Sequence, residues 1–133
     1  MKVIWINGVF DVLHVGHLNM LEHARSIGDK LIVGIDSDQK VKIDKGEGRP
    51  FNVQEDRKKI LEGIRYVDEV IIFSSKEELE NCIKKINPDV MVIGSDWMGK
   101  KIVGSEYAKE VKFFERIPGY STTAILNYEK SRY

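Results

Sequence analysis

One short stretch decides how this chain folds: Gly8-Val9-Phe10-Asp11-Val12-Leu13-His14-Val15-Gly16-His17. It follows an apolar run at residues 3–7, which predicts a β-strand, and it opens a segment with helical spacing. A strand that ends in a glycine turn before a helix directs backbone N–H groups and the positive end of a helix dipole at one point. This arrangement suits an anion, so the stretch predicts a phosphate-binding site.

Two of the three histidines belong to this stretch, and their spacing indicates a joint role. His14 and His17 are three residues apart at the predicted helix start, so they project from nearly the same face. Gly16 between them has no side chain, which lets a ligand approach the backbone closely. A shared zinc ion is the alternative, but the only cysteine, Cys82, lies far along the chain. We therefore expect no metal site at these histidines, and we expect His23 to be a surface or structural residue.

Composition limits the class of protein. The chain has 133 residues, enough for one hydrophobic core, so residues 1–133 are predicted to form a single domain. Basic and acidic residues number 21 each, and this balance gives no support for nucleic-acid or membrane-surface binding. The N-terminal apolar run is too short for a signal peptide, and no run approaches a membrane span. With one cysteine and therefore no internal disulfide, we expect a cytoplasmic protein.

Short apolar runs alternate with amphipathic segments along the chain. Strands are predicted at residues 3–7, 30–35, 69–73, 89–93 and 111–114. Helices are predicted at residues 16–27, 53–64, 75–86 and 121–128. This alternation predicts an α/β fold, a Rossmann-like three-layer domain with a five-stranded parallel sheet and right-handed crossovers.

Polar segments follow the predicted strands where a ligand site is expected. In an open parallel sheet, ligands bind beyond the carboxyl ends of the strands. Besides the Gly-His stretch, these segments are residues 36–38 with the basic loop 42–50, residues 94–97, and residues 116–123. Because these segments meet at one edge of the sheet, they predict a composite binding site.

Several candidates in these segments also have a structural interpretation. The hydroxyl run Ser121-Thr122-Thr123 can cap the helix that follows it or face an anion, and Arg116 nearby favours the second. Lys45 is either a solvated loop lysine or a phosphate ligand, and Arg57 is either part of a charged helix face or an anion ligand. The chain has neither a G-x-x-x-x-G-K-[ST] loop nor a G-x-G-x-x-G turn, which excludes the two commonest alternative phosphate cradles.

Three stretches together resemble the cytidylyltransferase-like family of nucleotidyltransferases. They are Gly8-Val9-Phe10-Asp11 with His14-Val15-Gly16-His17, Arg57 with Arg65-Tyr66-Val67-Asp68-Glu69-Val70, and Gly119-Tyr120-Ser121-Thr122-Thr123. The resemblance covers nearly the whole chain and implies a Rossmann-like fold. It further implies transfer of a nucleoside monophosphate from a nucleoside triphosphate to a sugar or polyol phosphate. Pyrophosphate would leave, and no covalent enzyme intermediate would form.

The resemblance also implies a role for each candidate residue. His14, His17 and the N–H groups around Val9 and Phe10 would contact the triphosphate, and Lys45 would clamp phosphates of both substrates. Mg²⁺ would bridge phosphate oxygens, and the domain would pair as a homodimer. The implied nucleotide-binding residues are Gly8, Val9, Phe10, Asp11, Gly16, Asp96, Trp97, Arg116, Ser121, Thr122 and Thr123, and the implied acceptor-binding residues are Arg57 and Arg65.

The base and the acceptor are left open between two members of this family. Residues 45–50 and 102–106 resemble the adenylyltransferase domain that acts on heptose 1-phosphate, whereas residues 94–97 and Arg116 resemble glycerol-3-phosphate cytidylyltransferase. The heptose enzyme with ATP is the favoured hypothesis, because the loop at 45–50 is expected beside the transferred phosphate. A nucleotide-sensing module without catalysis is the alternative from another class. Pyrophosphate release that depends on an acceptor distinguishes the enzyme from the sensor.

Overall fold

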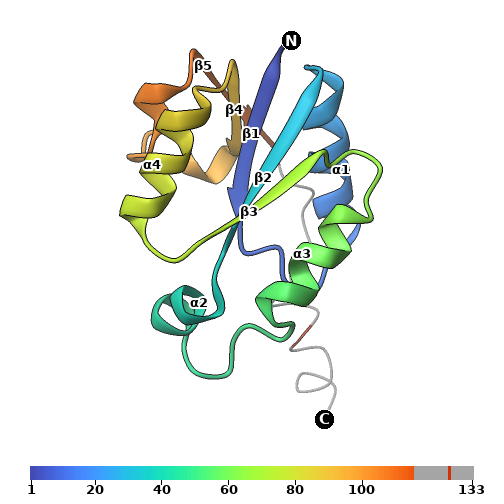
Figure 1. Ribbon diagram of the computed structural model, residues 1–133, viewed down its shortest axis with the longest axis vertical. Helices are drawn as coiled ribbons and strands as arrows, with labels where there is room; N and C mark the ends of the chain where they lie inside the picture. Colours follow the sequence, from blue (N-terminus) through green and yellow to red (C-terminus); the bar gives the residue numbers. More distant parts are fainter. Residues whose placement is uncertain (116–125, 127–133) are drawn as a thin grey trace.

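The computed structural model describes residues 1–115 and 126, and in them five parallel strands form one sheet in the order β3-β2-β1-β4-β5 (Figure 1). The strands are β1 (Val3–Gly8), β2 (Lys30–Asp36), β3 (Glu69–Phe73), β4 (Val90–Gly94) and β5 (Glu110–Phe114). The helices are α1 (Val15–Ser26), α2 (Asp38–Lys45), α3 (Gln54–Glu62) and α4 (Lys76–Ile86), with 3-10 turns η1 (Ser95–Trp97) and η2 (Ser105–Tyr107). The predicted Rossmann-like α/β fold is confirmed.

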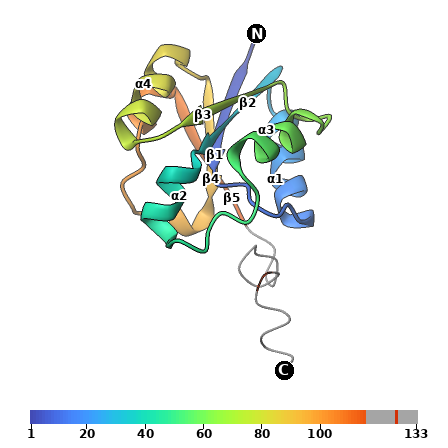
Figure 2. The same cartoon turned by 60° about the horizontal axis from the view of Figure 1, so that its bottom comes forward.

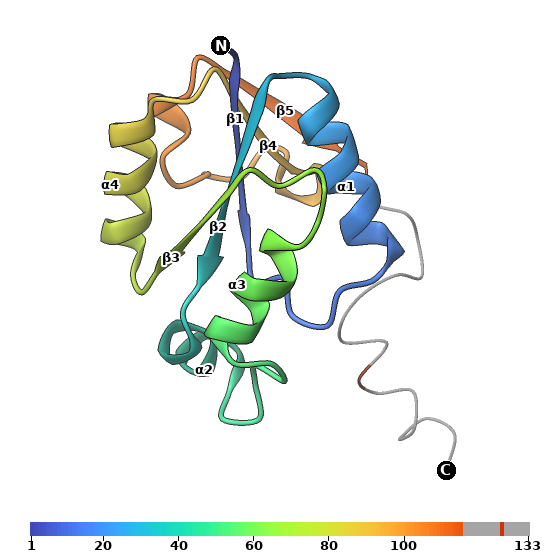
Figure 3. The same cartoon turned by 45° about the vertical axis from the view of Figure 1, so that its right-hand side comes forward.

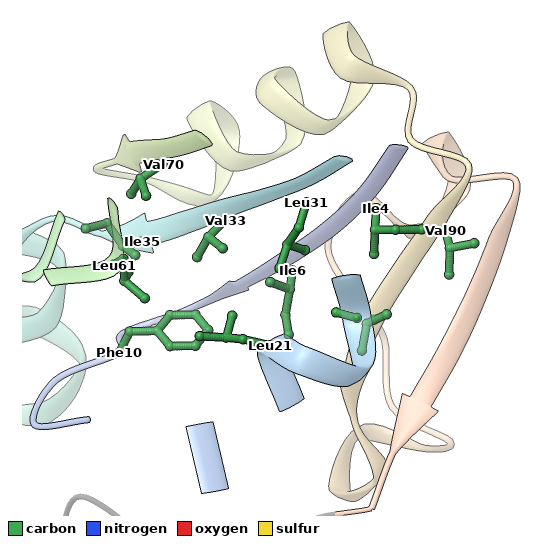
Figure 4. Packing of buried hydrophobic residues seen from close by; sticks show 12 residues of the cluster. Ile4, Ile6, Phe10, Leu21, Leu31, Val33, Ile35, Leu61, Val70 and Val90 are labelled. Carbon is green, nitrogen blue, oxygen red and sulfur yellow. The ribbon is translucent and has the colours of Figure 1, made fainter. Parts of the chain in front are cut away.

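Helices cover both faces of the sheet, which gives three layers (Figure 3). Helices α1 and α3 lie on one face, where Leu21 and Leu61 pack with Ile6 and other alternate strand residues (Figure 4). Helix α4 lies on the other face, over a second cluster that includes Trp5 and Ile83. Because both faces are covered, the central strands are nearly continuous apolar runs.

One glycine is required by this packing. Gly34 lies in β2 directly beside the Trp5 ring, and a Cβ at position 34 would stand 2.5 Å from Trp5 Cζ2. Such a contact is far shorter than a van der Waals separation, so the absence of a side chain lets the indole fill the core on the α4 face. The Trp5 Nε1–H donates to Asn7 Oδ1 at 2.8 Å, which satisfies the buried indole.

The structure adds one helix that the sequence pattern did not predict. Residues 38–45 form α2, although residues 42–50 were expected to be a loop. Only Val41 of this helix is buried, so it lacks an apolar face from which to recognise it. Ser37 caps its start by accepting the N–H of Lys40, and Gly46, with φ of +105°, ends it.

The other predicted elements agree with the described structure to within one or two residues at each end. The helix expected at 121–128 lies, apart from residue 126, outside the described residues. Within the described part of the chain, no helix has the length and apolar character that crossing a membrane requires.

Candidate active site

A cavity of about 730 Å³ opens at the carboxyl edge of the sheet. It is bounded by the start of α1, by α2 and by the segment after β4, and Figure 2 views the molecule from this side. The predicted site residues that line it are Gly8, Val9, Phe10, Asp11, His14, Gly16, His17, Lys45, Asp96 and Trp97. Segments far apart in the sequence therefore meet where an open parallel sheet binds its ligands.

His14 and His17 are held at the start of α1 through their own Nδ1 atoms. The Gly16 N–H donates to His14 Nδ1 at 3.1 Å, and the His14 N–H donates to His17 Nδ1 at 3.2 Å. These bonds form a capping box in which two imidazoles replace the usual hydroxyl and carboxylate. The two ring centroids lie only 3.9 Å apart. The histidine pair is thus part of the helix cap as well as of the cavity wall.

This capping role determines which nitrogen of each ring carries the proton. A nitrogen that accepts a hydrogen bond has no proton of its own, so in the neutral rings of His14 and His17 the proton is on Nε2. Each ring therefore has Nε2–H as its donor, on the opposite side of the imidazole from the cap. Two donors fixed this closely suit the oxygens of one phosphate group.

The turn between β1 and α1 is strained. Phe10 and Val12 both have φ of +52°, a left-handed conformation that a β-branched valine rarely adopts. Asp11 between them is buried, and its carboxylate accepts the N–H of Phe51 at 2.6 Å and of Asn52 at 2.9 Å. Buried contacts that hold a strained turn are typical of a functional site. Through these contacts Asp11 holds residues 51–52 against the turn of the motif.

Arg57 requires a correction, because its guanidinium is bonded to protein rather than directed into the cavity. The side chain is 1% exposed. Its Nε donates to Asn52 O at 3.0 Å, one terminal nitrogen donates to Val9 O and Asp36 O at 2.9 and 2.8 Å, and the other donates to Asp38 Oδ1 at 2.9 Å. Arg57 therefore joins the turns after β1 and β2 to the start of α3. It is a positioning residue, and acceptor binding by this side chain is not supported.

Arg65 requires a correction as well. It is exposed and lies between α3 and β3, where the Asp68 N–H donates to Leu31 O at the amino edge of the sheet. Because β2 and β3 are parallel, α3 has to carry the chain from the carboxyl edge back to the amino edge before β3 begins. Arg65 is therefore at the wrong edge to line the cavity within this chain.

Helix α2 contributes charged groups on the β2 side of the cavity. Lys45 is its last residue and is exposed, as a ligand for a bound anion has to be. Lys40 lies between Asp36 and Asp44, with Nζ to carboxylate distances of 2.9 and 2.7 Å. Burial lowers the pKa of the Lys40 ammonium, but the hydrogen bonds to Asp44 and Asp36 outweigh this effect and raise the pKa above its ordinary value. Lys40 is therefore a fixed positive charge.

The wall after β4 is more open. Asp96 and Trp97 belong to η1, and Trp97 keeps 41% of its surface exposed at the cavity. The Lys100 ammonium lies 5.8 Å from the centroid of the Trp97 ring. An exposed indole at a cavity edge offers a flat apolar surface for a ring-shaped ligand. The predicted nucleotide ligands Arg116, Ser121, Thr122 and Thr123 lie outside the described residues.

Sequence reasoning assigned no role to several polar residues that line the cavity. A position at or shortly after the end of a strand could have indicated Asn7, Asp36 and Lys76 as site residues. Lys40 and Asp44 could be placed at the cavity only once α2 was known. Arg49 lies in the quoted basic loop but had no role assigned to it. The additional polar residues that line the cavity are Asn7, Asp36, Lys40, Asp44, Arg49 and Lys76.

A parallel sheet whose first strand leads into paired, capped histidines at a cavity matches the arrangement that the resemblance to nucleotidyltransferases implies. The chain belongs to the cytidylyltransferase-like family, whose model matches residues 5–127. The family resemblance seen in the sequence is thereby confirmed, and with it the assignment of the chain as a nucleotidyltransferase enzyme.

Curated relatives agree with this family. The chain is 50% identical over 125 residues to "Bifunctional protein HldE" of Campylobacter concisus, covering 94% of this chain and 26% of that protein. The protein of the same name from Helicobacter pylori is 42% identical over 125 residues, with 94% and 27% covered. The chain thus spans about a quarter of the length of these relatives.

Two solved structures share the fold. The lipopolysaccharide core biosynthesis protein from Thermoplasma volcanium matches with a TM-score of 0.70 at 23% identity, over 86% of this chain and 97% of that one. A pantoate-beta-alanine ligase from Francisella tularensis matches with a TM-score of 0.56 at 16% identity, over 97% of this chain and 69% of that one. At these identities the likeness shows the fold alone.

Proposed function

We propose that this nucleotidyltransferase transfers AMP from ATP to the phosphate of a sugar 1-phosphate of the heptose type and releases pyrophosphate. The observation that carries the proposal is the histidine pair, capped through Nδ1 at the start of α1 and lining the cavity. The acceptor class rests on the resemblance of residues 45–50 to enzymes that act on sugar phosphates. Residues 45–50 begin with Lys45, the last residue of α2, and include Arg49, and both of these side chains line the cavity.

The mechanism follows from charge and alignment. A phosphate monoester is already a nucleophile at neutral pH, so transfer to it needs positioning and charge neutralisation more than a strong base. The Nε2–H groups of His14 and His17, together with the N-terminal N–H groups of α1, stabilise the charge that develops on the α-phosphate. The exposed ammonium of Lys45 lies between the two anionic substrates and offsets their repulsion.

Mg²⁺ is the proposed cofactor, carried by the substrate. The described residues contain no group of three His, Cys, Asp or Glu side chains that could hold a metal ion. Mg²⁺ binds nucleotides chiefly through phosphate oxygens and water and needs few protein ligands, so this donor set fits an ion that arrives with the triphosphate. When bound, it neutralises charge on the phosphates. The residues of the chain then orient the triphosphate and the acceptor.

Two further properties stay predictions from the sequence. We propose a homodimer in the cytoplasm, and sedimentation of the purified chain tests the first of these. A single sedimenting species of twice the mass of the 15.3 kDa chain supports the dimer, and a species of the chain mass contradicts it.

The test of the reaction is a matrix of four nucleoside triphosphates against several phosphorylated acceptors, with Mg²⁺ present. Release of pyrophosphate that requires both ATP and heptose 1-phosphate is the expected result. A protein that binds a triphosphate but releases no pyrophosphate with any acceptor would contradict the transfer. The His17→Ala variant, checked for folding by circular dichroism, is the negative control, since it removes one of the proposed donors.

Calorimetric titration with each triphosphate decides the base. Tight binding of CTP with no detectable binding of ATP would reverse the proposed order. It would promote glycerol 3-phosphate as the acceptor, in line with the second resemblance, in which Asp96 and Trp97 face the nucleoside. The exposed Trp97 ring at the cavity edge is compatible with either base.

A further inference from the structure

Arg49 brings a guanidinium to the cavity without a hydrogen bond from the described part of the protein. Its Nε is buried and has no hydrogen-bond partner among the described residues, while the side chain as a whole is 19% exposed. The nearest carboxylate is Asp11, whose Oδ2 lies 3.9 Å from that Nε, beyond hydrogen-bond distance. A buried charged donor without an acceptor is costly. Arg49 therefore lines the cavity with a guanidinium whose Nε has no acceptor among the described residues.

The backbone around Arg49 is firmly held, which distinguishes it from a mobile surface arginine. Asp11 accepts the N–H groups of Phe51 and Asn52, and the Arg49 N–H donates to Gly46 O at 3.1 Å. Both carboxylate oxygens of Asp11 thus bind the backbone of the segment that carries Arg49. This is the reverse of Arg57, whose guanidinium is consumed by four protein acceptors.

The order of the strands indicates which substrate Arg49 meets. The histidine pair follows the central strand β1, Asp96 and Trp97 follow β4 on one side, and the segment of Arg49 follows β2 and α2 on the other. Three groups meet at the α-phosphorus: the nucleoside, the leaving pyrophosphate and the attacking phosphate. With the nucleoside over β4 and the leaving phosphates on the start of α1, the β2 side remains for the acceptor.

We propose that Arg49 binds the phosphate group of the acceptor, the role that the sequence suggested for Arg57 and Arg65. The inference rests on the proposed nucleotidyl transfer for the identity of its ligand. A guanidinium pairs with a phosphate through two parallel N–H···O bonds, which holds the phosphate in one orientation as well as binding it. In-line attack on the α-phosphorus depends on that orientation.

The kinetic test uses Arg49→Lys and Arg49→Gln, with Lys59→Ala as a control that removes one exposed positive charge from α3 away from the cavity. Both Arg49 variants are expected to raise the KM for the acceptor by about ten-fold or more, because lysine cannot form the two parallel bonds and glutamine lacks the charge. The KM for the triphosphate is expected to stay within about two-fold of wild type. A raised KM for the triphosphate alone, or no change in either KM, overturns the proposal.

A binding measurement separates this proposal from the proposed function. Inorganic phosphate is titrated by ³¹P nuclear magnetic resonance into wild type and Arg49→Gln, both saturated with an ATP analogue whose α–β bridge is a methylene group. Arg49→Gln is expected to bind phosphate at least about ten-fold more weakly while it binds the analogue normally. If wild type transfers no nucleotide to any acceptor and phosphate binding still depends on Arg49, the function fails and the phosphate site stands. Equal phosphate binding by both proteins overturns the site.

Discussion

The two edges of the sheet both carry charged side chains, but these side chains have different roles at each edge. At the amino edge, an aspartate precedes each of β2, β3 and β4, and each makes the same reciprocal pair of bonds with a neighbouring strand. The aspartate N–H donates to the carbonyl of a residue at or next to the start of the neighbouring strand, and its carboxylate accepts the N–H of that same residue. The pairs are Asp29 with Lys2, Asp68 with Leu31, and Asp89 with Val3.

At the carboxyl edge, charged side chains face the cavity. Lys45 and Arg49 line it, and two histidines have their Nε2 donors on the side away from the helix cap. At the amino edge the aspartate carboxylates bind backbone N–H groups and contribute to stability. At the carboxyl edge Lys45 and Arg49 line the cavity where the ligand is proposed to bind. Asp11, Lys40 and Arg57 do not follow this division, because protein groups already bind all three side chains at the carboxyl edge. The comparison therefore makes distinct predictions for each edge.

The largest effect is expected at Arg57, the exception at the carboxyl edge. Arg57→Ala is expected to lower the free energy of unfolding by about 3–5 kcal/mol, because it leaves the Asp38 carboxylate and three backbone carbonyls without a buried donor. Urea denaturation measures this loss. Arg65→Ala at the amino edge is the matched control, with an expected cost below about 1 kcal/mol. A stable Arg57→Ala enzyme with only a raised KM for the acceptor would restore the substrate role of Arg57.

The histidine pair is expected to show the largest kinetic effect. His14→Ala and His17→Ala should each lower turnover by about 10²-fold or more, as the loss of one preorganised donor does. Near-normal turnover in either variant would contradict the assignment. His14→Asn separates the two roles of His14, because asparagine caps a helix well but has no ring Nε2. It should keep the stability of wild type and lose turnover.

His23→Ala is the control for this pair. His23 lies on the same helix, is exposed and contacts the Phe114 ring at 5.2 Å between centroids, away from the capping box. Its turnover should match wild type. A large loss of turnover in His23→Ala would indicate that any change in α1 disturbs the site. The losses in His14→Ala and His17→Ala would then not show that these two residues act as donors in the reaction.

The sequence was sufficient for the sheet and for the centre of the site, and the reasons are physical. Buried parallel strands require apolar runs, such as residues 30–35, and a glycine turn with two close histidines has few structural explanations. Helix α2 escaped prediction because a single buried residue, Val41, anchors it. The sequence pattern did not distinguish the roles of Arg49, Arg57 and Arg65. Two segments that bind Arg57, residue 9 and residues 36–38, are distant from it in the sequence, and only the direction of α3 places Arg65 away from the cavity.

Lys45 is an exposed cation of the carboxyl edge, and its substitution tests whether such a cation contributes to catalysis. Lys45→Ala is expected to lower kcat/KM by about ten-fold, because the repulsion between two anionic substrates loses one compensating charge in a partly screened environment. Lys42→Ala is the matched control, since Lys42 belongs to the last turn of the same helix and is exposed outside the cavity lining. Equal kinetics in the two variants would make Lys45 an ordinary surface lysine.

The smallest effect is expected at the amino edge and concerns pH. The N–H of Val3, followed by the ammonium of Lys109, holds the pKa of Asp89 below its ordinary value of 3.8. A carboxyl group whose pKa is lower in the folded state contributes stability above the ordinary value, and the contribution is lost as the pH falls through the folded value. Asp89→Asn should therefore lose less stability than wild type on acidification below that value. Parallel acid curves for wild type and Asp89→Asn would mean that the reciprocal pairs act through hydrogen bonds without help from charge.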